Sequence, residues 1–171
     1  MGKRSDFERK ERDFYPTPKE AVEPLLRHLE PKSTFDEPCA GDGALANHLE
    51  YFGFDIGGCS DIVPQGSGVN QKNVFDVTYC EGDMFITNPP WDRKILHPLI
   101  THLSSMAPTW LLFDASWMHT KQSSDLIKYC EKIVSVGRIK WFPGTKHTGK
   151  DDCCWYLFGQ DFDEETKFFG R

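Results

Sequence analysis

The sequence contains no long uninterrupted apolar stretch. No run approaches the roughly 18 apolar residues that a membrane-spanning helix requires. Residues 1–13 mix both charge signs where a signal peptide would need an apolar core. These absences predict a cytoplasmic protein that has no membrane partner.

Cysteine pairs at the C-x-x-C spacing are also missing. Six cysteines occur, at positions 39, 59, 80, 130, 153 and 154, and several lie in apolar stretches, as unbridged thiols of cytosolic proteins do. The histidines lack partners at metal-ligand spacing, since His97 and His102 lie five residues apart and therefore on different faces of a predicted helix. We expect neither a disulfide framework nor a metal site.

An excess of positive charge is absent as well. The chain carries 20 Lys and Arg against 26 Asp and Glu, a net charge of −6, which argues against non-specific binding to nucleic acid. Residues 138–150 depart from this balance, because they contain no acid and four basic residues interleaved with aromatic residues and glycine. This basic stretch suits a loop that contacts phosphates, and its candidate contacts are Arg138, Lys140, Trp141, Lys146 and Lys150. Because two acids follow at 151 and 152, a solvated hairpin tip is the alternative.

The composition of the whole chain is that of a folded domain. Hydrophobic residues make up 39% of the 171 residues and aromatic residues 13%, which excludes a disordered chain. No internal repeat and no linker-like stretch divides it. We expect residues 1–12 to form a charged, mobile arm and residues 13–171 to form one domain.

Apolar runs and turn residues predict alternating elements. The predicted helices cover residues 18–30, 43–52, 93–106 and 123–130, and the predicted strands cover residues 34–37, 54–60, 74–78, 84–87, 109–114, 132–136 and 153–158. The first helix starts at Thr17-Pro18-Lys19-Glu20, the pattern of a capping box. Alternating strands and helices predict an α/β fold whose mostly parallel sheet is covered on both faces.

A glycine-containing turn follows the first predicted strand. The segment Glu37-Pro38-Cys39-Ala40-Gly41-Asp42-Gly43 places small residues where the backbone would approach a ligand, ahead of a helix N-terminus. Asp61 ends the second predicted strand, 20 residues after Gly41. A carboxylate at this place can accept hydrogen bonds from both hydroxyls of a ribose. The pair indicates an adenosine-containing cofactor, and an ordinary strand-to-helix turn is the alternative.

A second motif follows the strand predicted at 84–87. Asn88-Pro89-Pro90-Trp91 has two consecutive prolines that fix the backbone at the carboxyl edge of the sheet, where open α/β sheets bind ligands. A rigid exposed turn is the alternative. Its place after the two upstream elements favours a functional interpretation.

Together these motifs resemble the class I S-adenosylmethionine-dependent methyltransferases that modify adenine N6 in DNA, and among them the compact enzymes of bacteriophages and prophages. The resemblance rests on Asp13-Phe14-Tyr15-Pro16-Thr17-Pro18, Glu37 to Gly43, Ser60-Asp61-Ile62 and Asn88 to Trp91, and extends loosely to about residue 158. It implies a Rossmann-like fold in which helices flank a mostly parallel sheet with an antiparallel C-terminal strand. It also implies a bacterial or phage-infected cell.

The resemblance implies S-adenosylmethionine as the cofactor. Tyr15 and Thr17 would lie over its methionine end, Asp61 would hold the ribose, and Asp76 would accept from the adenine amine, with Asp83 as a rival. Cys39 would fill space in the turn. The full set of cofactor-binding residues implied in this way is Tyr15, Thr17, Glu37, Cys39, Ala40, Gly41, Gly43, Asp61, Ile62, Asp76 and Asn88.

The same resemblance makes Asn88, Pro89, Pro90 and Trp91 the catalytic residues. The side-chain oxygen of Asn88 and the carbonyl of Pro89 would accept the hydrogens of the target amine, and Trp91 would stack on the extruded base. An aromatic amine is a poor nucleophile until two acceptors favour a pyramidal nitrogen, and acceptors fixed beforehand cost no reorganisation. Methyl transfer is then a direct in-line displacement without metal.

The sequence leaves three alternatives to a DNA adenine enzyme. RNA adenine is a close rival, because nothing in the sequence tests for a 2′-hydroxyl. A protein-glutamine N5-methyltransferase would solve the same nitrogen problem with a related motif. A non-catalytic subunit could bind the cofactor or nucleic acid beside a partner. Since no separate target-recognition domain is expected, the target sequence stays open, as does the oligomeric state.

Overall fold

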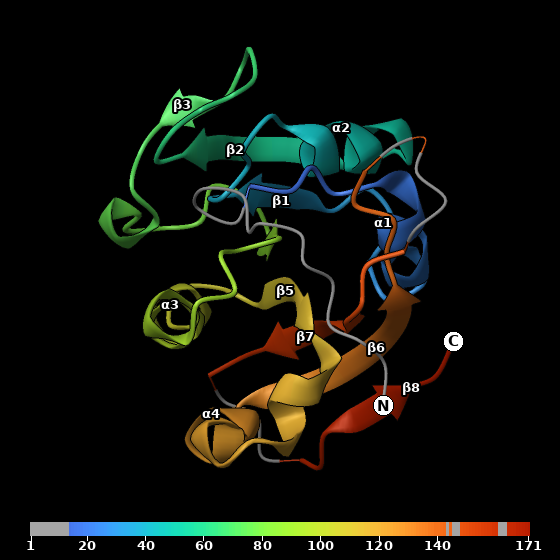
Figure 1. Cartoon of the computed structure of the whole chain (residues 1–171). Coiled ribbons are helices and arrows are strands. Elements are labelled where there is room, and N and C mark those ends of the chain that lie inside the picture. The colour runs from blue at the N-terminus through green and yellow to red at the C-terminus, as the bar shows by residue number, and fades with distance from the viewer. Residues whose placement is uncertain (1–13, 143, 145–147, 161–163) are drawn as a thin grey trace.

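The strands pair side by side in the order β3-β2-β1-β4-β5-β7-β6-β8, forming one eight-stranded sheet (Figure 1). The computed structural model describes residues 14–142, 144, 148–160 and 164–171. The arm predicted at 1–12 and Lys146 of the basic stretch lie outside the described residues. Every neighbouring strand pair is parallel except the two that include β7. The predicted α/β fold with one antiparallel strand is therefore confirmed.

The strands are β1 (Thr34–Glu37), β2 (Asp55–Asp61), β3 (Asn70–Gln71), β4 (Met84–Thr87), β5 (Thr109–Asp114), β6 (Cys130–Arg138), β7 (Asp152–Phe158) and β8 (Lys167–Phe169). The α-helices are α1 (Lys19–Leu26), α2 (Ala44–Tyr51), α3 (Arg93–Ser104) and α4 (Ser124–Ile127). The short 3₁₀ helices among the described residues are η2 (Val74–Asp76), η3 (Ala115–His119) and η4 (Lys121–Ser123). None of the helices in the described part of the chain has the length and apolar character to cross a membrane.

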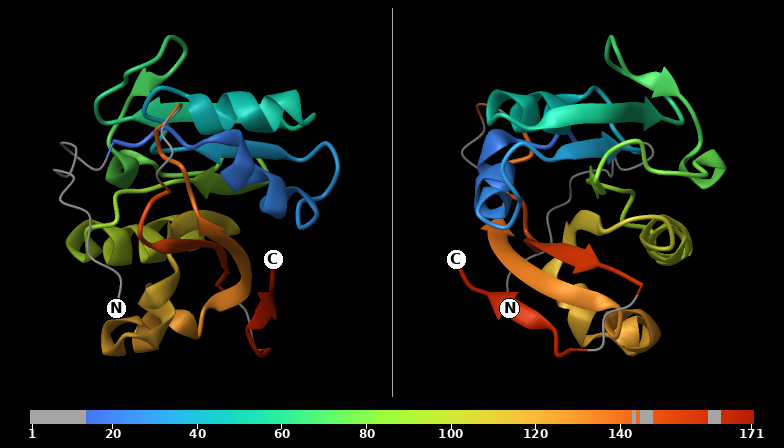
Figure 2. Two further views of the ribbon diagram at one scale, coloured as in Figure 1. Left: turned by 45° about the vertical axis from the view of Figure 1, so that its right-hand side comes forward. Right: turned by 180° about the vertical axis from the view of Figure 1, so that it is seen from behind.

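Helices cover both faces of the sheet, as Figure 2 shows from two sides. Helices α1 and α2 pack on one face and α3 on the other, each with its own hydrophobic cluster. Strand β5 serves both clusters, since Trp110 and Leu112 face α1 whereas Leu111 and Phe113 face α3. This alternation follows from the two-residue period of a strand, and burial on both faces explains the continuous apolar run.

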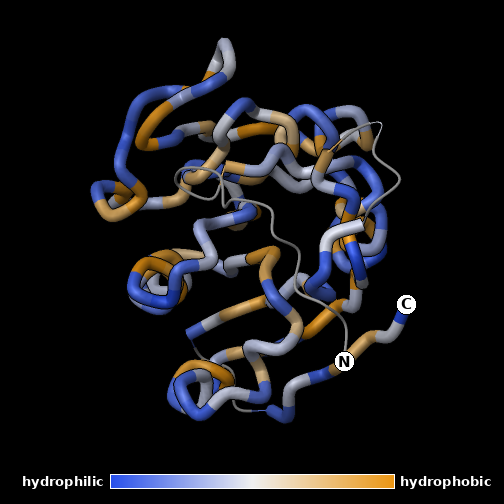
Figure 3. Tube along the Cα trace, in the orientation of Figure 1, coloured by the Kyte–Doolittle hydropathy of each residue, from blue (hydrophilic) through white to orange (hydrophobic). Residues whose placement is uncertain are grey.

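Helix α3 follows its predicted pattern closely. Its buried residues are Leu96, Leu99, Ile100, Leu103 and Ser104, at the spacing that puts side chains on one face of a helix. Figure 3 shows hydrophobic and hydrophilic colours on opposite sides of its turns. The Asp92 side chain accepts a hydrogen bond from the Lys94 backbone N–H at 3.0 Å and so caps the helix start.

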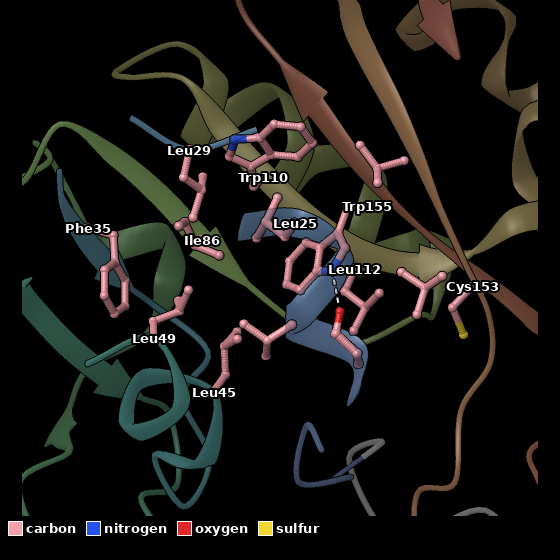
Figure 4. Close-up of a cluster of buried hydrophobic side chains, with 14 of the residues drawn as sticks. Leu25, Leu29, Phe35, Leu45, Leu49, Ile86, Trp110, Leu112, Cys153 and Trp155 are labelled. Atoms are coloured by element: carbon pink, nitrogen blue, oxygen red, sulfur yellow. Dashed lines mark hydrogen bonds between the residues drawn. The ribbon is translucent and has the colours of Figure 1, made fainter. Parts of the chain in front are cut away.

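Helix α1 is fixed to the sheet by a buried hydrogen bond. The indole N–H of Trp155 on β7 donates to the Ala21 carbonyl oxygen at 2.7 Å, as Figure 4 shows among the surrounding apolar side chains. The predicted capping box is wrong, because no side chain caps this helix and Pro18 occupies the cap position. The two polar residues of the predicted box have distant partners instead: Thr17 accepts from Asn88 and Glu20 accepts from the Lys140 backbone N–H.

Two other local predictions are corrected, and two short strands were not predicted. The segment predicted as a strand at 74–78 contains the 3₁₀ helix η2 (Val74–Asp76), and Val74 and the following Val77 join the same cluster. The helix predicted at 123–130 ends at Ile127, because β6 begins at Cys130. Strands β3 and β8, of two and three residues, are too short for a sequence pattern to predict.

Candidate active site

A cavity of about 1120 Å³ lies beyond the carboxyl ends of β1, β2 and β4, where open α/β sheets bind ligands. Most of the predicted cofactor residues line it: Tyr15, Thr17, Glu37, Cys39, Ala40, Gly41, Asp61, Ile62 and Asn88. Of the predicted catalytic residues, Asn88 and Pro90 line it. Gly43, Asp76, Pro89 and Trp91 are not among its lining residues.

The turn after β1 needs its two glycines for conformational reasons. Gly41 and Gly43 have φ angles of +57° and +83°, which side chains rarely tolerate. A Cβ on Gly41 would also lie 2.6 Å from the Phe14 ring. The missing side chain of Gly41 therefore makes room for the segment 14–18 to lie against the turn.

Asp61 ties this turn to the end of β2. Its Oδ2 accepts a hydrogen bond from the Gly41 N–H and its Oδ1 accepts one from the Val63 N–H, both at 2.8 Å. Each carboxylate oxygen can accept more than one hydrogen bond. Asp61 can therefore hold the turn and still accept hydroxyl groups from a ligand in the cavity.

Glu37 is a buried acid at the floor of the cavity. Only 2% of its surface is exposed, and its Oε2 accepts a hydrogen bond from the Ala46 N–H in the first turn of α2 at 3.0 Å. Burial raises the pKa of Glu37 well above its ordinary value, and the nearby charges of Asp42 and Asp61 act in the same direction. The environment of this carboxyl group thus favours its protonated form.

Asn88, directly after β4, has partners on both ends of its side-chain amide. Its Nδ2 donates to Thr17 Oγ1 at 3.1 Å and to the Tyr15 carbonyl oxygen at 3.4 Å. Its Oδ1 accepts from the indole N–H of Trp91 at 3.2 Å. The segment 14–18 therefore supplies both hydrogen-bond acceptors of the Asn88 amide nitrogen. The resemblance assigns Tyr15 and Thr17 to the cofactor and does not predict these bonds.

Four aromatic side chains gather beside Asn88, and we call Tyr15, Trp91, Trp141 and Phe142 the aromatic cluster. The Trp141 ring centroid lies 5.8 Å from that of Trp91 and 5.9 Å from that of Tyr15. Tyr15 and Phe142 meet edge to face at 6.0 Å. The cluster joins the basic stretch to the Asn-Pro-Pro-Trp motif, which no sequence spacing predicts.

The basic stretch is partly neutralised by its own neighbours. Arg138 lies 3.9 Å from the Asp152 carboxylate, and both side chains are exposed. The Nζ of Lys150 is buried and has no hydrogen-bond partner in the described part of the chain. Lys140 is exposed next to Trp141, which leaves it the best placed of these described cations to meet a ligand at the aromatic cluster.

Neither acid predicted for the cofactor adenine, Asp76 or Asp83, lines the cavity. Asp83 accepts a hydrogen bond from the Thr34 N–H at 2.8 Å, and because Thr34 begins β1, Asp83 lies at the opposite edge of the sheet. The η2 residues at the cavity are instead Val74 and Phe75, preceded by Asn73.

Sequence reasoning missed an apolar rim around this cavity. Its members are cavity-lining residues that are also exposed, namely Ile62, Val63, Phe75 and Ile95. Of these, only Ile62 was a predicted site residue. Exposed apolar side chains that gather around a cavity are typical of a site for a planar apolar group. Only the folded chain brings them together, since they come from the β2 end, η2 and α3.

Cysteine and metal chemistry find no support in the described residues. Burial raises the pKa of the Cys39 thiol far above its ordinary value, with the charge of Asp61 acting in the same direction, so this thiol stays neutral. Within residues 14–142, 144, 148–160 and 164–171, no group of three or more His, Cys, Asp or Glu could hold a metal ion.

Comparison with known proteins identifies the fold. No protein-family model and no curated sequence matches the chain. A Pyrococcus horikoshii protein described as an RNA methyltransferase matches with TM-score 0.62 and 16% identity, over 88% of each chain. A dimethyladenosine transferase from Plasmodium falciparum matches with TM-score 0.57 and 15% identity, over 86% of this chain and 63% of that one.

A third solved structure was determined with its cofactor. Magnesium protoporphyrin IX methyltransferase from Synechocystis, with bound S-adenosylmethionine, matches with TM-score 0.53 and 13% identity, over 81% of this chain and 76% of that one. The chain therefore has the class I methyltransferase fold. Its cavity lies at the carboxyl ends of the parallel strands.

Proposed function

We propose that this protein is an S-adenosylmethionine-dependent methyltransferase that acts on the exocyclic N6 amine of adenine in DNA. The observation that carries the proposal is the Asn-Pro-Pro-Trp motif at the end of β4, with Asn88 lining the cavity and the aromatic cluster beside it. Asn88 brings one acceptor for an amine to a cavity large enough for a nucleoside cofactor, and Trp91, bonded to Asn88, offers a ring for a flat base.

The residues of the cavity fit the proposed cofactor. Asp61 keeps lone pairs for the ribose hydroxyls, and the apolar rim offers Ile62 and Phe75 to an adenine ring. Tyr15 and Thr17 lie next to Asn88, where the methionine end and its methyl group would have to be. When bound, S-adenosylmethionine supplies an activated methyl group, so the protein needs no nucleophile of its own.

The chain's own contribution is to prepare the target nitrogen. Asn88 Oδ1 and the Pro89 carbonyl oxygen accept the two hydrogens of the amine, which withdraws its lone pair from the aromatic ring. Because β4 and the two prolines fix both acceptors before the reaction, no reorganisation is required in the transition state, and each can supply on the order of a 100-fold acceleration. The nitrogen loses one proton after transfer, and this proton leaves to solvent.

The aromatic cluster and Lys140 are the proposed contacts with nucleic acid. A base that leaves its stack loses contacts that an aromatic side chain can replace, at roughly 1 to 3 kcal/mol per stacked base. Trp91 and Trp141 present such rings next to Asn88, and Lys140 adds an exposed positive charge. These features support a nucleobase over a protein glutamine, which offers no ring to stack.

RNA adenine is the second candidate. One protein of similar fold is described as an RNA methyltransferase, and at 16% identity this likeness shows the fold and not the substrate. The aromatic cluster serves either polymer, because both expose the same adenine ring once it is unstacked.

The experiment that tests the proposal offers the protein a radiolabelled methyl donor with DNA, RNA or unfolded protein in turn. We expect the label in DNA, and N6-methyldeoxyadenosine after nuclease digestion. DNA in which a purine without the exocyclic amine replaces adenine, and the Asn88→Ala variant, are the matched controls. Label in RNA alone would move the assignment to the second candidate, and label in protein alone would refute the nucleic-acid proposal.

A further inference from the structure

The side-chain amide of Asn88 can act in catalysis in one of its two orientations only. Its oxygen accepts hydrogen bonds, whereas its nitrogen carries two hydrogens and donates. A target amine also presents hydrogens. If the amide turned by 180°, Nδ2 would face the amine and two sets of donors would repel each other. Some group in the protein must therefore hold the nitrogen on the side away from the target.

The structure supplies two acceptors on the nitrogen side. Thr17 Oγ1 lies 3.1 Å from Asn88 Nδ2 and the Tyr15 carbonyl oxygen lies 3.4 Å from it. The Tyr15 carbonyl oxygen has no hydrogen, so it cannot pair with Oδ1, and the indole N–H of Trp91, which donates to Oδ1 at 3.2 Å, cannot pair with Nδ2. A hydroxyl can donate or accept, so Thr17 favours this orientation as long as its own hydrogen is bonded elsewhere. The Thr17 bond is the shorter of the two, and Thr17 is only 4% exposed, which protects the bond from exchange with water.

Thr17 is held in place by the core. Helix α1 begins two residues later at Lys19, and the buried bond from Trp155 to the Ala21 carbonyl oxygen fixes its first turn at 2.7 Å. Ala21, Val22 and Leu25 are completely buried in the cluster of that face. The packing of α1 thus fixes the backbone position of Thr17, whose hydroxyl bonds to the amide of Asn88.

We infer that Thr17 is a positioning residue for methyl transfer, whose hydroxyl, together with the Tyr15 carbonyl oxygen and the indole N–H of Trp91, holds the Asn88 amide in the orientation that leaves Oδ1 available to the target amine. The inference rests on the proposed function and gives the segment before α1 a role in the chemical step. The hydroxyl accepts from Asn88 and keeps its own hydrogen for another acceptor, such as the carboxylate of a bound amino-acid group. Orientation errors in a reacting group commonly cost about 100-fold in rate.

The test compares Thr17→Val with Thr17→Ser. Valine keeps the volume but removes the acceptor, and serine keeps the acceptor but removes the methyl group. At saturating S-adenosylmethionine, we expect kcat on adenine-containing DNA to fall by about tenfold or more in Thr17→Val and to stay within about threefold in Thr17→Ser. Calorimetry with S-adenosylhomocysteine measures cofactor binding separately. A loss of cofactor affinity with an unchanged kcat in Thr17→Val would overturn the inference.

A double substitution isolates the orientation effect. In Asn88→Asp, either carboxylate oxygen accepts hydrogen bonds, so there is no wrong orientation for Thr17 to prevent. We therefore expect Thr17→Val to cost less in kcat in the Asn88→Asp background than in the wild type. Equal costs in both backgrounds would mean that Thr17 acts on the cofactor or on folding, and would overturn the inference.

A measurement without turnover separates this inference from the proposed function. The chain has four asparagines, so selective ¹⁵N labelling gives a small set of side-chain amide signals, and the Asn88 signal is the one missing in Asn88→Asp. We expect this signal to shift in Thr17→Val and to return toward its wild-type position in Thr17→Ser. An unchanged signal in Thr17→Val overturns the inference. Absence of methyl transfer by the wild type to any nucleic acid overturns the proposed function instead.

Discussion

The indole N–H of Trp91 lies 3.2 Å from Asn88 Oδ1 and also 3.2 Å from the Leu112 carbonyl oxygen. One hydrogen is thus shared between two acceptors, and one of them is the oxygen proposed to receive the target amine. Asn88 Oδ1 has two lone pairs, so this bond occupies the acceptor only in part. These two bonds consequently hold the ring of Trp91 beside Asn88.

This arrangement predicts that the ring and the N–H of Trp91 contribute differently. In Trp91→Phe the aromatic ring is kept and the bond to Asn88 is lost, so we expect methyl transfer to persist. In Trp91→Ala the ring is lost, and we expect kcat/KM to fall by an amount corresponding to roughly 1 to 3 kcal/mol. Steady-state kinetics on adenine-containing DNA measures both. Equal losses in the two variants would show that the N–H matters more than stacking.

A second prediction concerns Asn88 itself. Asn88→Ala removes one of the two acceptors for the target amine, and we expect kcat to fall by at least about 100-fold. Affinity for S-adenosylhomocysteine, measured by calorimetry, should stay within a few-fold, because the role proposed for Asn88 is on the amine. If affinity fell as far as kcat, Asn88 would be a cofactor residue first.

A third prediction distinguishes the acids around the cavity. Hydrogen bonds to a charged group are worth about 1.5 to 3 kcal/mol each, so Asp61→Ala should weaken binding of S-adenosylhomocysteine by about tenfold or more. Asp83→Ala is the matched control, because this carboxylate also accepts a backbone N–H, from Thr34, but lies at the other edge of the sheet. The affinity of Asp83→Ala for S-adenosylhomocysteine should be unchanged. Equal weakening in Asp83→Ala would mean that loss of any carboxylate at a strand end disturbs the cavity, and would remove the specific role of Asp61.

The mostly parallel sheet and the place of the cavity follow from local sequence signals. Gly41 and Asp61 mark the ends of two neighbouring strands, and the structure joins them by a hydrogen bond of 2.8 Å. The partners of Asn88 could not be predicted, since Thr17 lies 71 residues earlier in the chain and its sequence context indicates a helix cap. Residue type suggests which groups can bond, but only the packing of α1 on β7 decides which of them meet.

The residues that line the cavity beside β2 show the same limit. Aspartate at position 76 or 83 has the right chemistry for an adenine amine, whereas the fold places Asn73, Val74 and Phe75 at the cavity. The short 3₁₀ helix η2 causes this difference, because it turns the chain where an alternating strand was predicted. A one-turn element carries too little periodicity to be distinguished from a strand.

Stability should depend on pH through Glu37. Its pKa lies well above the ordinary 4.5, chiefly because the carboxyl group is buried, so the folded chain binds the proton more tightly than the unfolded chain. The stabilising contribution is complete below pH 4.5 and is lost as the pH rises toward the raised pKa. Glu37→Gln, which can still accept from Ala46, should therefore gain stability relative to the wild type as the pH rises.

Chemical denaturation at a series of pH values measures this difference. The comparison variant is Glu23→Gln, which also removes one negative charge but lies exposed on α1. We expect the free energy of unfolding of Glu37→Gln to exceed that of the wild type by a margin that widens above pH 4.5. A constant margin across the range would mean that Glu37 does not exchange its proton on unfolding.

The last prediction concerns the approach of nucleic acid to the aromatic cluster. Lys140 is exposed, and its backbone N–H is held by Glu20 Oε1 at 3.4 Å, next to Trp141. If its charge neutralises one phosphate, Lys140→Gln should reduce the slope of the logarithm of the binding constant against the logarithm of salt concentration by about 0.9 for duplex DNA. Lys128→Gln, at the end of α4 and away from the cavity, removes the same charge and should leave the slope unchanged. Fluorescence anisotropy with labelled DNA over a range of salt concentrations measures both slopes. A reduction of equal size in the two variants would mean that DNA senses only the overall charge of the protein, and an unchanged slope in Lys140→Gln would remove this residue from the interface.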